Sequence, residues 1–155
     1  MNNRAVFAGT FDPFTLGHYE IANRASKICD TLFVAVSDEK SKNTRYTLEE
    51  RIEIARLSLA DIPNVKVVAF SGFLVDFMRE NDIKVMVRGL RNTIDFEYER
   101  NLFNAYKSQD EEIEAYYFMA SNEYLHVSSS LVRQVLDYGG DISKYVKKEA
   151  VSKIK

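Results

Sequence analysis

Cysteine, basic charge in excess and long apolar runs are all scarce in this chain of 155 residues. Cys29 is the only cysteine, which excludes an internal disulfide. Its place in a helix-patterned stretch favours a small buried side chain over a reactive thiol. The lack of disulfides fits a reducing compartment, and the first residues show no charged, apolar and cleavage regions of an export signal. We therefore expect a cytoplasmic protein.

Neither a membrane nor nucleic acid is an expected partner. No apolar stretch approaches the roughly 20 residues that cross a bilayer. The formal net charge of -2 lacks the basic excess of a general nucleic-acid surface. The P-loop pattern Gly-x-x-x-x-Gly-Lys-Ser/Thr and the dinucleotide pattern Gly-x-Gly-x-x-Gly are also missing. These absences argue against a P-loop NTPase and a dinucleotide oxidoreductase, but they permit a local cationic site for a small anion.

Short apolar runs alternate with helix-patterned stretches along the whole chain. The runs predict strands at 5–8, 32–36, 65–70, 83–87 and 115–119. Apolar residues at helical spacing predict helices around 21–29, 48–59, 73–80, 96–106 and 131–136, and a short amphipathic helix from Ser143. The alternation predicts an α/β fold, a Rossmann-like doubly wound five-stranded parallel sheet with helices on both faces, as a single domain over residues 1–155.

In such a sheet, ligands bind beyond the carboxyl ends of the strands, so the loops there are the candidate site. The first loop runs from Gly9 to His18, and its Asp12-Pro13 pair predicts a turn. Gly9 and Gly17 allow close approach of a ligand, and Thr15 is placed to cap the following helix. A helix N-terminus favours an anion, and the His18 imidazole can donate there to a phosphate oxygen.

Three further loops carry polar or basic side chains. The segment 38–45 is polar and basic, which is typical of a solvated loop when taken alone. Arg88 and Arg91 flank a glycine and suit phosphate oxygens, although they could instead pair with carboxylates such as Asp95 or Glu97. The segment 124–130 ends in three serines, which could cap a helix, seat phosphates, or do both.

The segment from Gly9 to His18 resembles the T/H-x-G-H signature of the nucleotidyltransferase superfamily. Its form is most similar to that of the bacterial phosphopantetheine adenylyltransferases. Four further segments match that family in order and spacing: 46–51, 87–91, 95–99 and 127–132. The resemblance therefore extends along nearly the whole chain.

The resemblance also implies roles for individual residues. It makes His18, Lys42 and Arg91 catalytic, and it makes Thr10, Lys42, Leu74 and Arg88 contacts of the acceptor substrate. Two of these residues have an alternative interpretation of comparable weight. Glu99 could be a solvated carboxylate on a helix, and Leu74 could be a core leucine. Tyr124 stands where many members have tryptophan, and His126 lies at a variable position and is given no catalytic role. The implied ATP contacts are Thr10, Phe11, His18, Gly89, Leu90, Arg91, Glu99, Tyr124, Leu125, His126, Val127, Ser128, Ser129 and Ser130.

The implied reaction is reversible transfer of the adenylyl group of ATP to 4′-phosphopantetheine, with Mg²⁺ arriving on ATP because no close Asp/Glu cluster offers a separate metal site. The family also implies a homohexamer and possible feedback binding of coenzyme A. Two alternatives stay open at this point. One is another nucleotidyltransferase, such as a nicotinate-mononucleotide adenylyltransferase, and the other is a nucleotide-sensing module without turnover.

Overall fold

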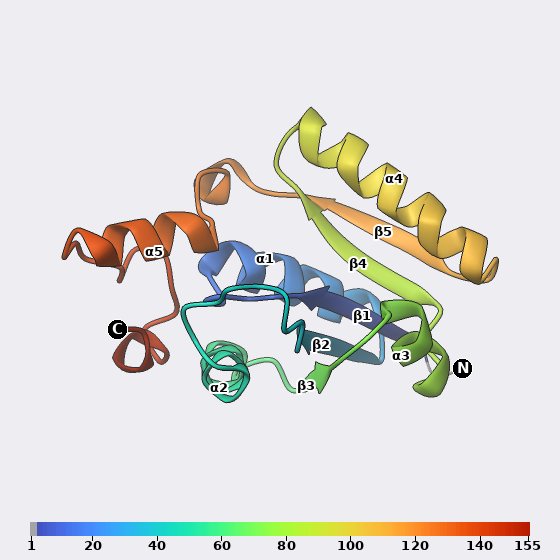
Figure 1. Ribbon diagram of the computed structural model, residues 1–155, viewed down its shortest axis with the longest axis horizontal. Helices are drawn as coiled ribbons and strands as arrows, with labels where there is room; N and C mark the ends of the chain where they lie inside the picture. Colours follow the sequence, from blue (N-terminus) through green and yellow to red (C-terminus); the bar gives the residue numbers. More distant parts are fainter. Residues whose placement is uncertain (1–2) are drawn as a thin grey trace.

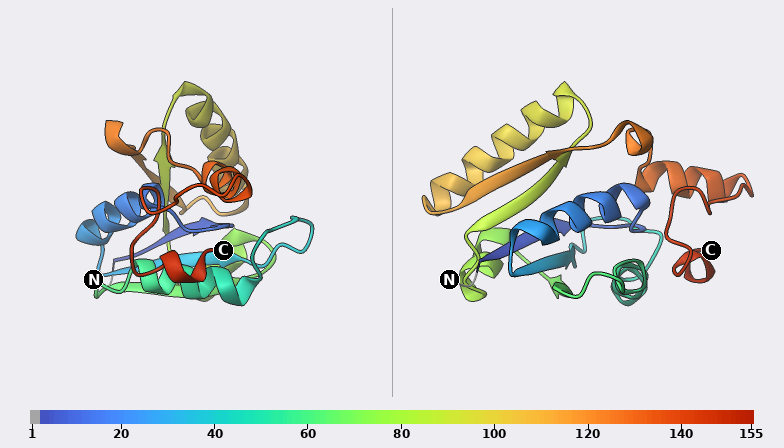
Figure 2. Two further views of the ribbon diagram at one scale, coloured as in Figure 1. Left: turned by 90° about the vertical axis from the view of Figure 1, so that its left-hand side faces the viewer. Right: turned by 180° about the vertical axis from the view of Figure 1, so that it is seen from behind.

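The computed structural model describes residues 3–155, in which strands and helices alternate along the chain (Figures 1 and 2). The strands are β1 Arg4–Gly9, β2 Thr31–Ser37, β3 Val65–Phe70, β4 Val85–Leu90 and β5 Glu114–Met119. The α-helices are α1 Leu16–Ala25, α2 Leu48–Ser58, α3 Leu74–Glu80, α4 Thr93–Gln109 and α5 Ser129–Asp137. Short 3-10 turns are η1 Ser26–Ile28, η2 Asn122–Tyr124 and η3 Val151–Lys153.

The five strands form one parallel sheet, as predicted, and their order in it is β3-β2-β1-β4-β5. β1 pairs with β2 along its whole length, but with β4 only where Ala5 and Val6 face Val85 and Met86. Beyond that point β4 leaves β1, and Figure 1 shows it rising away with β5. The chain also reverses its winding direction between β1 and β4. This is the switch point at which open α/β sheets bind ligands.

Alternate side chains of the central strands enter two different cores. On one face, Phe7 and Val34 pack with apolar residues of α1 and α2. On the other face, Val6 and Ala35 pack with α3, and Phe103 of α4 joins this second cluster. The sheet is thus covered by helices on both faces, which confirms the predicted layering. No helix among residues 3–155 combines the length and the apolar character that a membrane span requires.

Several predicted boundaries are wrong for local reasons. β4 begins at Val85, because the Ile83 backbone N–H instead donates to the carbonyl of Met78 at the end of α3. Ile28 lies outside α1, in a 3-10 turn, and is 47% exposed. The predicted α-helix from Ser143 is replaced by turns and η3. There the Tyr145 carbonyl accepts from the Leu16 N–H of α1, so it serves a tertiary contact.

Candidate active site

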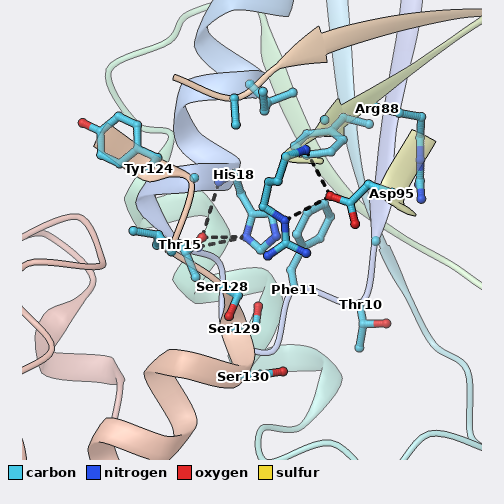
Figure 3. A pocket seen from close by; sticks show the side chains of 18 of the residues that line it. Thr10, Phe11, Thr15, His18, Arg88, Asp95, Tyr124, Ser128, Ser129 and Ser130 are labelled. Carbon is cyan, nitrogen blue, oxygen red and sulfur yellow. Dashed lines mark hydrogen bonds and ion pairs between the residues drawn. The ribbon is translucent and has the colours of Figure 1, made fainter. Parts of the chain in front are cut away.

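A cavity of about 380 Å³ lies at the switch point. Its walls come from the ends of β1 and β4, the first turn of α1, the start of α4 and the loop leading into α5 (Figure 3). Many of the predicted site residues meet there, although they are far apart in the sequence. The lining includes Thr10, Phe11, His18, Arg88, Gly89, Arg91, Glu99, Tyr124, Val127, Ser128, Ser129 and Ser130.

The first turn of α1 holds His18 by a capping box. Thr15 is the N-cap, and its hydroxyl accepts from the His18 backbone N–H at 3.4 Å. In return, His18 Nδ1 accepts from the Thr15 backbone N–H at 3.0 Å. Histidine thus takes the place that Glu or Gln occupies in most capping boxes. A neutral imidazole that accepts at Nδ1 carries its proton on Nε2.

The surroundings keep this imidazole neutral. The Phe11 ring stands edge-on to it at 5.0 Å between ring centroids, and Phe14 lies 5.2 Å away. Burial lowers the pKa of His18 from its ordinary 6.5 to about 4, and the positive charge of Arg91 adds to the effect. At neutral pH, His18 is therefore a fixed N–H donor and carries no charge. Figure 3 places it centrally, between Thr15, Phe11 and the serines of α5.

Two residues of the first loop have reasons for their identity that the sequence did not indicate. A Cβ on Gly9 would come within 3.0 Å of the Phe11 ring, so Gly9 makes room for that ring as it folds under His18. Gly9 also lines the cavity, so the predicted close approach of a ligand stays a prediction beside this packing role. Asp12 is buried, and its carboxylate accepts from the backbone N–H groups of Arg45 and Tyr46 at 2.9 and 3.0 Å. Asp12 therefore ties the first loop to the second.

Lys42 extends from the second loop toward the first. Its Nζ donates to the Thr10 hydroxyl at 3.2 Å and pairs with Glu39 at 3.1 Å. Lys42 does not line the cavity wall itself, but Thr10 does. The contact confirms that the second loop sits beside the first, as predicted, and it brings an ammonium group to the cavity edge.

Arg88 of β4 and Arg91 directly after it both have carboxylate partners and also line the cavity. Arg88 makes a two-pronged pair with Glu99, in which both N···O distances are 2.7 Å, and also donates to the Ala8 carbonyl. Arg91 pairs with Asp95 at 3.3 Å. Pairing with carboxylates, one of the two alternatives from the sequence, is therefore confirmed, although the partner of Arg88 is Glu99 and not Glu97. Phosphate binding by these arginines stays a prediction. Because Arg88 engages both oxygens of Glu99, the contact of Glu99 with a nucleotide stays a prediction.

The N-terminus of α5 closes the cavity on a further side. Ser128 is its N-cap and accepts from the Leu131 N–H at 3.1 Å, so one of the three hydroxyls is a cap, as expected. Ser129 donates to the Pro13 carbonyl at 2.8 Å, which ties α5 to the first loop. The first N–H groups of a helix lack intrahelical acceptors, so they are available to an anion at this wall.

Besides Lys42, four predicted contacts lie outside the cavity lining. Leu74, the first residue of α3, is buried in the core, which agrees with its alternative interpretation as a core leucine. Leu90 is buried as well, Leu125 is 40% exposed, and the His126 ring lies near that of Tyr145. Their ligand contacts stay predictions. Thr15 and Asp95 also line the cavity, and the sequence analysis did not place them there. The four-residue spacing of Arg91 and Asp95 could have indicated their contact, because residues four apart are neighbours on a helix.

The described residues of the site supply fixed hydrogen-bond donors and cations, but no cluster of side chains that would bind a metal ion. Within residues 3–155, no group of three or more His, Cys, Asp or Glu side chains is placed to hold a metal ion. The two acidic side chains of the lining, Asp95 and Glu99, are paired with arginines. Such a site can orient phosphates and stabilise charge on their oxygens.

Comparison with known proteins agrees with this geometry. Residues 6–135 match the model of the cytidylyltransferase-like family. The chain is similar to the phosphopantetheine adenylyltransferase of Nautilia profundicola, with 43% identity over 97% of this chain and 98% of the relative. It is 45% identical to that of Lachnoclostridium phytofermentans over 91% of this chain and 86% of the relative. It is 47% identical to that of Polynucleobacter necessarius over 92% of this chain and 86% of the relative.

Proposed function

The chain belongs to the cytidylyltransferase-like family and, within it, to the phosphopantetheine adenylyltransferases, and on that basis we propose the reaction that it catalyses. It transfers the adenylyl group of ATP to 4′-phosphopantetheine, giving dephospho-coenzyme A and pyrophosphate, a reversible step of coenzyme A biosynthesis. The observation that carries the proposal is the neutral His18 in its capping box, facing a cavity that Lys42 borders and Arg88 and Arg91 line.

The acceptor needs no general base. A phosphomonoester is mostly dianionic at pH 7 because its second pKa is about 6. It attacks the α-phosphorus of ATP, a P–O bond to the attacking oxygen forms, and pyrophosphate leaves with the electrons of the broken P–O bond. The enzyme has to hold two anions in line and stabilise the charge on the equatorial oxygens.

Each predicted catalytic residue has a place in that step. The Nε2–H of His18 donates to a non-bridging oxygen of the α-phosphate. The ammonium of Lys42, held at Thr10, bridges the attacking phosphate and the α-phosphate. Arg91 and the N-terminus of α5 hold the departing pyrophosphate. Arg88, fixed by Glu99, binds the phosphate of the acceptor.

The same family membership supports further proposals on the metal ion, the compartment, the oligomer and the regulation of the enzyme. Mg²⁺ arrives bound to the ATP phosphates, since hard cations favour phosphate oxygens and water as ligands. We place the enzyme in the cytoplasm as a homohexamer, and coenzyme A is a candidate feedback ligand because it contains the product of the reaction.

Pyrophosphate release tests the proposal. The purified protein is incubated with Mg²⁺ and ATP, together with 4′-phosphopantetheine in one arm and nicotinate mononucleotide in the other. We expect pyrophosphate only with 4′-phosphopantetheine, at a rate proportional to enzyme concentration. Release with nicotinate mononucleotide instead would place the chain in another branch, and ATP binding without release in either arm would favour a nucleotide sensor.

A further inference from the structure

Arg51 of α2 is a buried cation with no place in the mechanism described above. Only 4% of it is exposed. Among residues 3–155, no carboxylate lies within 4.0 Å of its guanidinium nitrogens. A buried charge is costly unless other groups compensate it, so its retention at this position requires a reason.

The partners of Arg51 are three backbone carbonyls from three segments. Its NH1 group donates to the carbonyl of Thr10, just past β1, at 2.7 Å and to that of Ser37, the last residue of β2, at 2.9 Å. Its Nε donates to the carbonyl of Tyr46, before α2, at 3.2 Å. One rigid fork therefore joins both loops that border the cavity.

Thr10 and Lys42 depend on this junction. The Thr10 hydroxyl accepts from Lys42 at 3.2 Å, while the carbonyl of the same Thr10 accepts from Arg51. The second loop departs from Ser37 and returns at Tyr46, and Arg51 holds both of its ends. Lys42 is 53% exposed at its side chain, so its own packing does little to locate it.

We propose that Arg51 is a positioning residue, which holds the Thr10 backbone and both ends of the second loop so that the Lys42 ammonium meets the acceptor phosphate. The inference rests on the proposed function, since Lys42 acts in adenylyl transfer. Arg51 touches no substrate in this role. A lysine at the same place would keep the charge but could not serve three acceptors with a planar fork.

A double-mutant cycle between Arg51→Lys and Lys42→Gln tests the coupling. We expect Arg51→Lys to lower kcat between about tenfold and about a hundredfold, as expected when a reacting group is misplaced by a fraction of an ångström to about 1 Å. In the Lys42→Gln background the same change should lower kcat less than about threefold. If Arg51→Lys lowers kcat by the same factor in both backgrounds, Arg51 acts independently of Lys42 and the inference is overturned.

Two controls separate positioning from stability. Ile54→Val, a core change on the same helix, should lower the melting temperature without lowering kcat. Arg56→Lys, an exposed change on α2, should alter neither. A loss of kcat in Ile54→Val that matches that of Arg51→Lys would make instability the cause. If wild-type protein releases no pyrophosphate, the proposed function fails, whereas an active wild type with a multiplicative cycle contradicts only the role of Arg51.

A measurement on the wild type covers the case in which Arg51→Lys does not fold. The Nε–H resonance of Arg51 should exchange slowly with solvent and should shift when 4′-phosphopantetheine saturates the protein. The Nε–H resonance of the exposed Arg56 should not shift. An Arg51 resonance that stays in place at saturation would contradict the proposal.

Discussion

At the scale of the residue, His18 shows how one side chain can be fixed in both direction and protonation. The Thr15 N–H donates to Nδ1, so the one nitrogen-bound proton of the neutral ring is on Nε2. Desolvation and Arg91 lower the pKa of the ring to about 4, which keeps it neutral near pH 7. Preorganised donors of this kind need no reorganisation as charge develops on a phosphate oxygen.

Replacement of His18 tests which nitrogen donates. We expect His18→Ala to fold and bind ATP but to lower kcat by about 10²–10³, the usual effect of losing one transition-state donor. Gln carries its amide NH₂ near the position of Nε2, and Asn carries it near that of Nδ1. His18→Gln should therefore retain more activity than His18→Asn. Steady-state kinetics of the three variants decide this, and a fully active alanine variant would remove His18 from the mechanism.

The lowered pKa of His18 also predicts a pH effect on stability. The unfolded imidazole, with an ordinary pKa of 6.5, takes up a proton before the folded one, at about 4. Protons therefore favour the unfolded chain, and the free energy of unfolding should fall by up to about 3 kcal/mol between pH 6.5 and 4. Above about pH 7 this contribution should not change with pH.

Two measurements check this effect. The ring resonances of His18, assigned with the His18→Gln variant, should not titrate between pH 5.5 and 8. Denaturant unfolding should show a shallower loss of stability on acidification in His18→Gln than in the wild type. A His18 titration midpoint near 6.5 in the folded protein would contradict the burial of the ring.

At the scale of the element, the two capping boxes of α1 and α2 have the same form and different consequences. In α2, the Thr47 hydroxyl accepts from the Glu50 N–H and the Glu50 carboxylate accepts from the Thr47 N–H. The three-residue spacing of Thr47 and Glu50 in the sequence is typical of such a box. In α1, Thr15 was predicted as a cap, but its partnership with the His18 ring was not, because histidine is no usual member of such a box.

Alanine at each cap separates stability from catalysis. Thr47→Ala and Thr15→Ala should each cost about 1 kcal/mol of stability, the usual cost of a lost N-cap side chain. Only Thr15→Ala should also lower kcat, by roughly threefold to tenfold, because it loosens the turn that aims His18. Thermal unfolding and initial rates on the same preparations would test this. Equal kcat in both variants would mean that the backbone N–H of Thr15 suffices to hold the ring.

The sequence predicted some elements more closely than others, because apolar runs specify strands better than apolar spacing specifies a helical backbone. The strands β1, β2 and β3 were located closely because apolar runs define them. The tail after Ser143 was predicted as an α-helix from its apolar spacing, and Val146, Ala150 and Ile154 are indeed buried. Their backbone is not α-helical, since tertiary contacts such as that between Leu16 and Tyr145 compete with the helical bonds. The apolar spacing therefore predicted which side chains are buried, but it did not predict the backbone conformation.

At the scale of the whole molecule, the sheet topology gathers cations that are scattered along an acidic chain. The formal net charge is -2, yet Arg88 and Arg91 line one cavity and Lys42 reaches its edge through Thr10. The gathering of the loops at one edge of the sheet could be predicted, because parallel strands place their carboxyl ends there. The ion pairs could not be assigned, since several carboxylates were within reach in sequence.

The pair of Arg88 and Glu99 connects substrate choice to stability. Arg88→Ala should raise the KM for 4′-phosphopantetheine roughly tenfold to a hundredfold, the loss of a charge-assisted hydrogen bond of about 1.5–3 kcal/mol. ATP binding should be largely intact. The change also leaves Glu99, which is 7% exposed, without its partner, so the protein should lose up to about 3–5 kcal/mol of stability.

The double variant Arg88→Ala/Glu99→Gln separates the two effects, because it removes the stranded charge without restoring a cation for the acceptor phosphate. Thermal unfolding should recover most of the lost stability, while the KM for 4′-phosphopantetheine should stay raised. Pantetheine, which lacks the phosphate, should not react with any of the proteins, since it has neither the ionised nucleophile nor its anchor. Isothermal titration with each ligand completes the comparison. A KM that recovers together with stability, or an equal loss of ATP binding, would mean that Arg88 supports the fold and does not bind the acceptor phosphate.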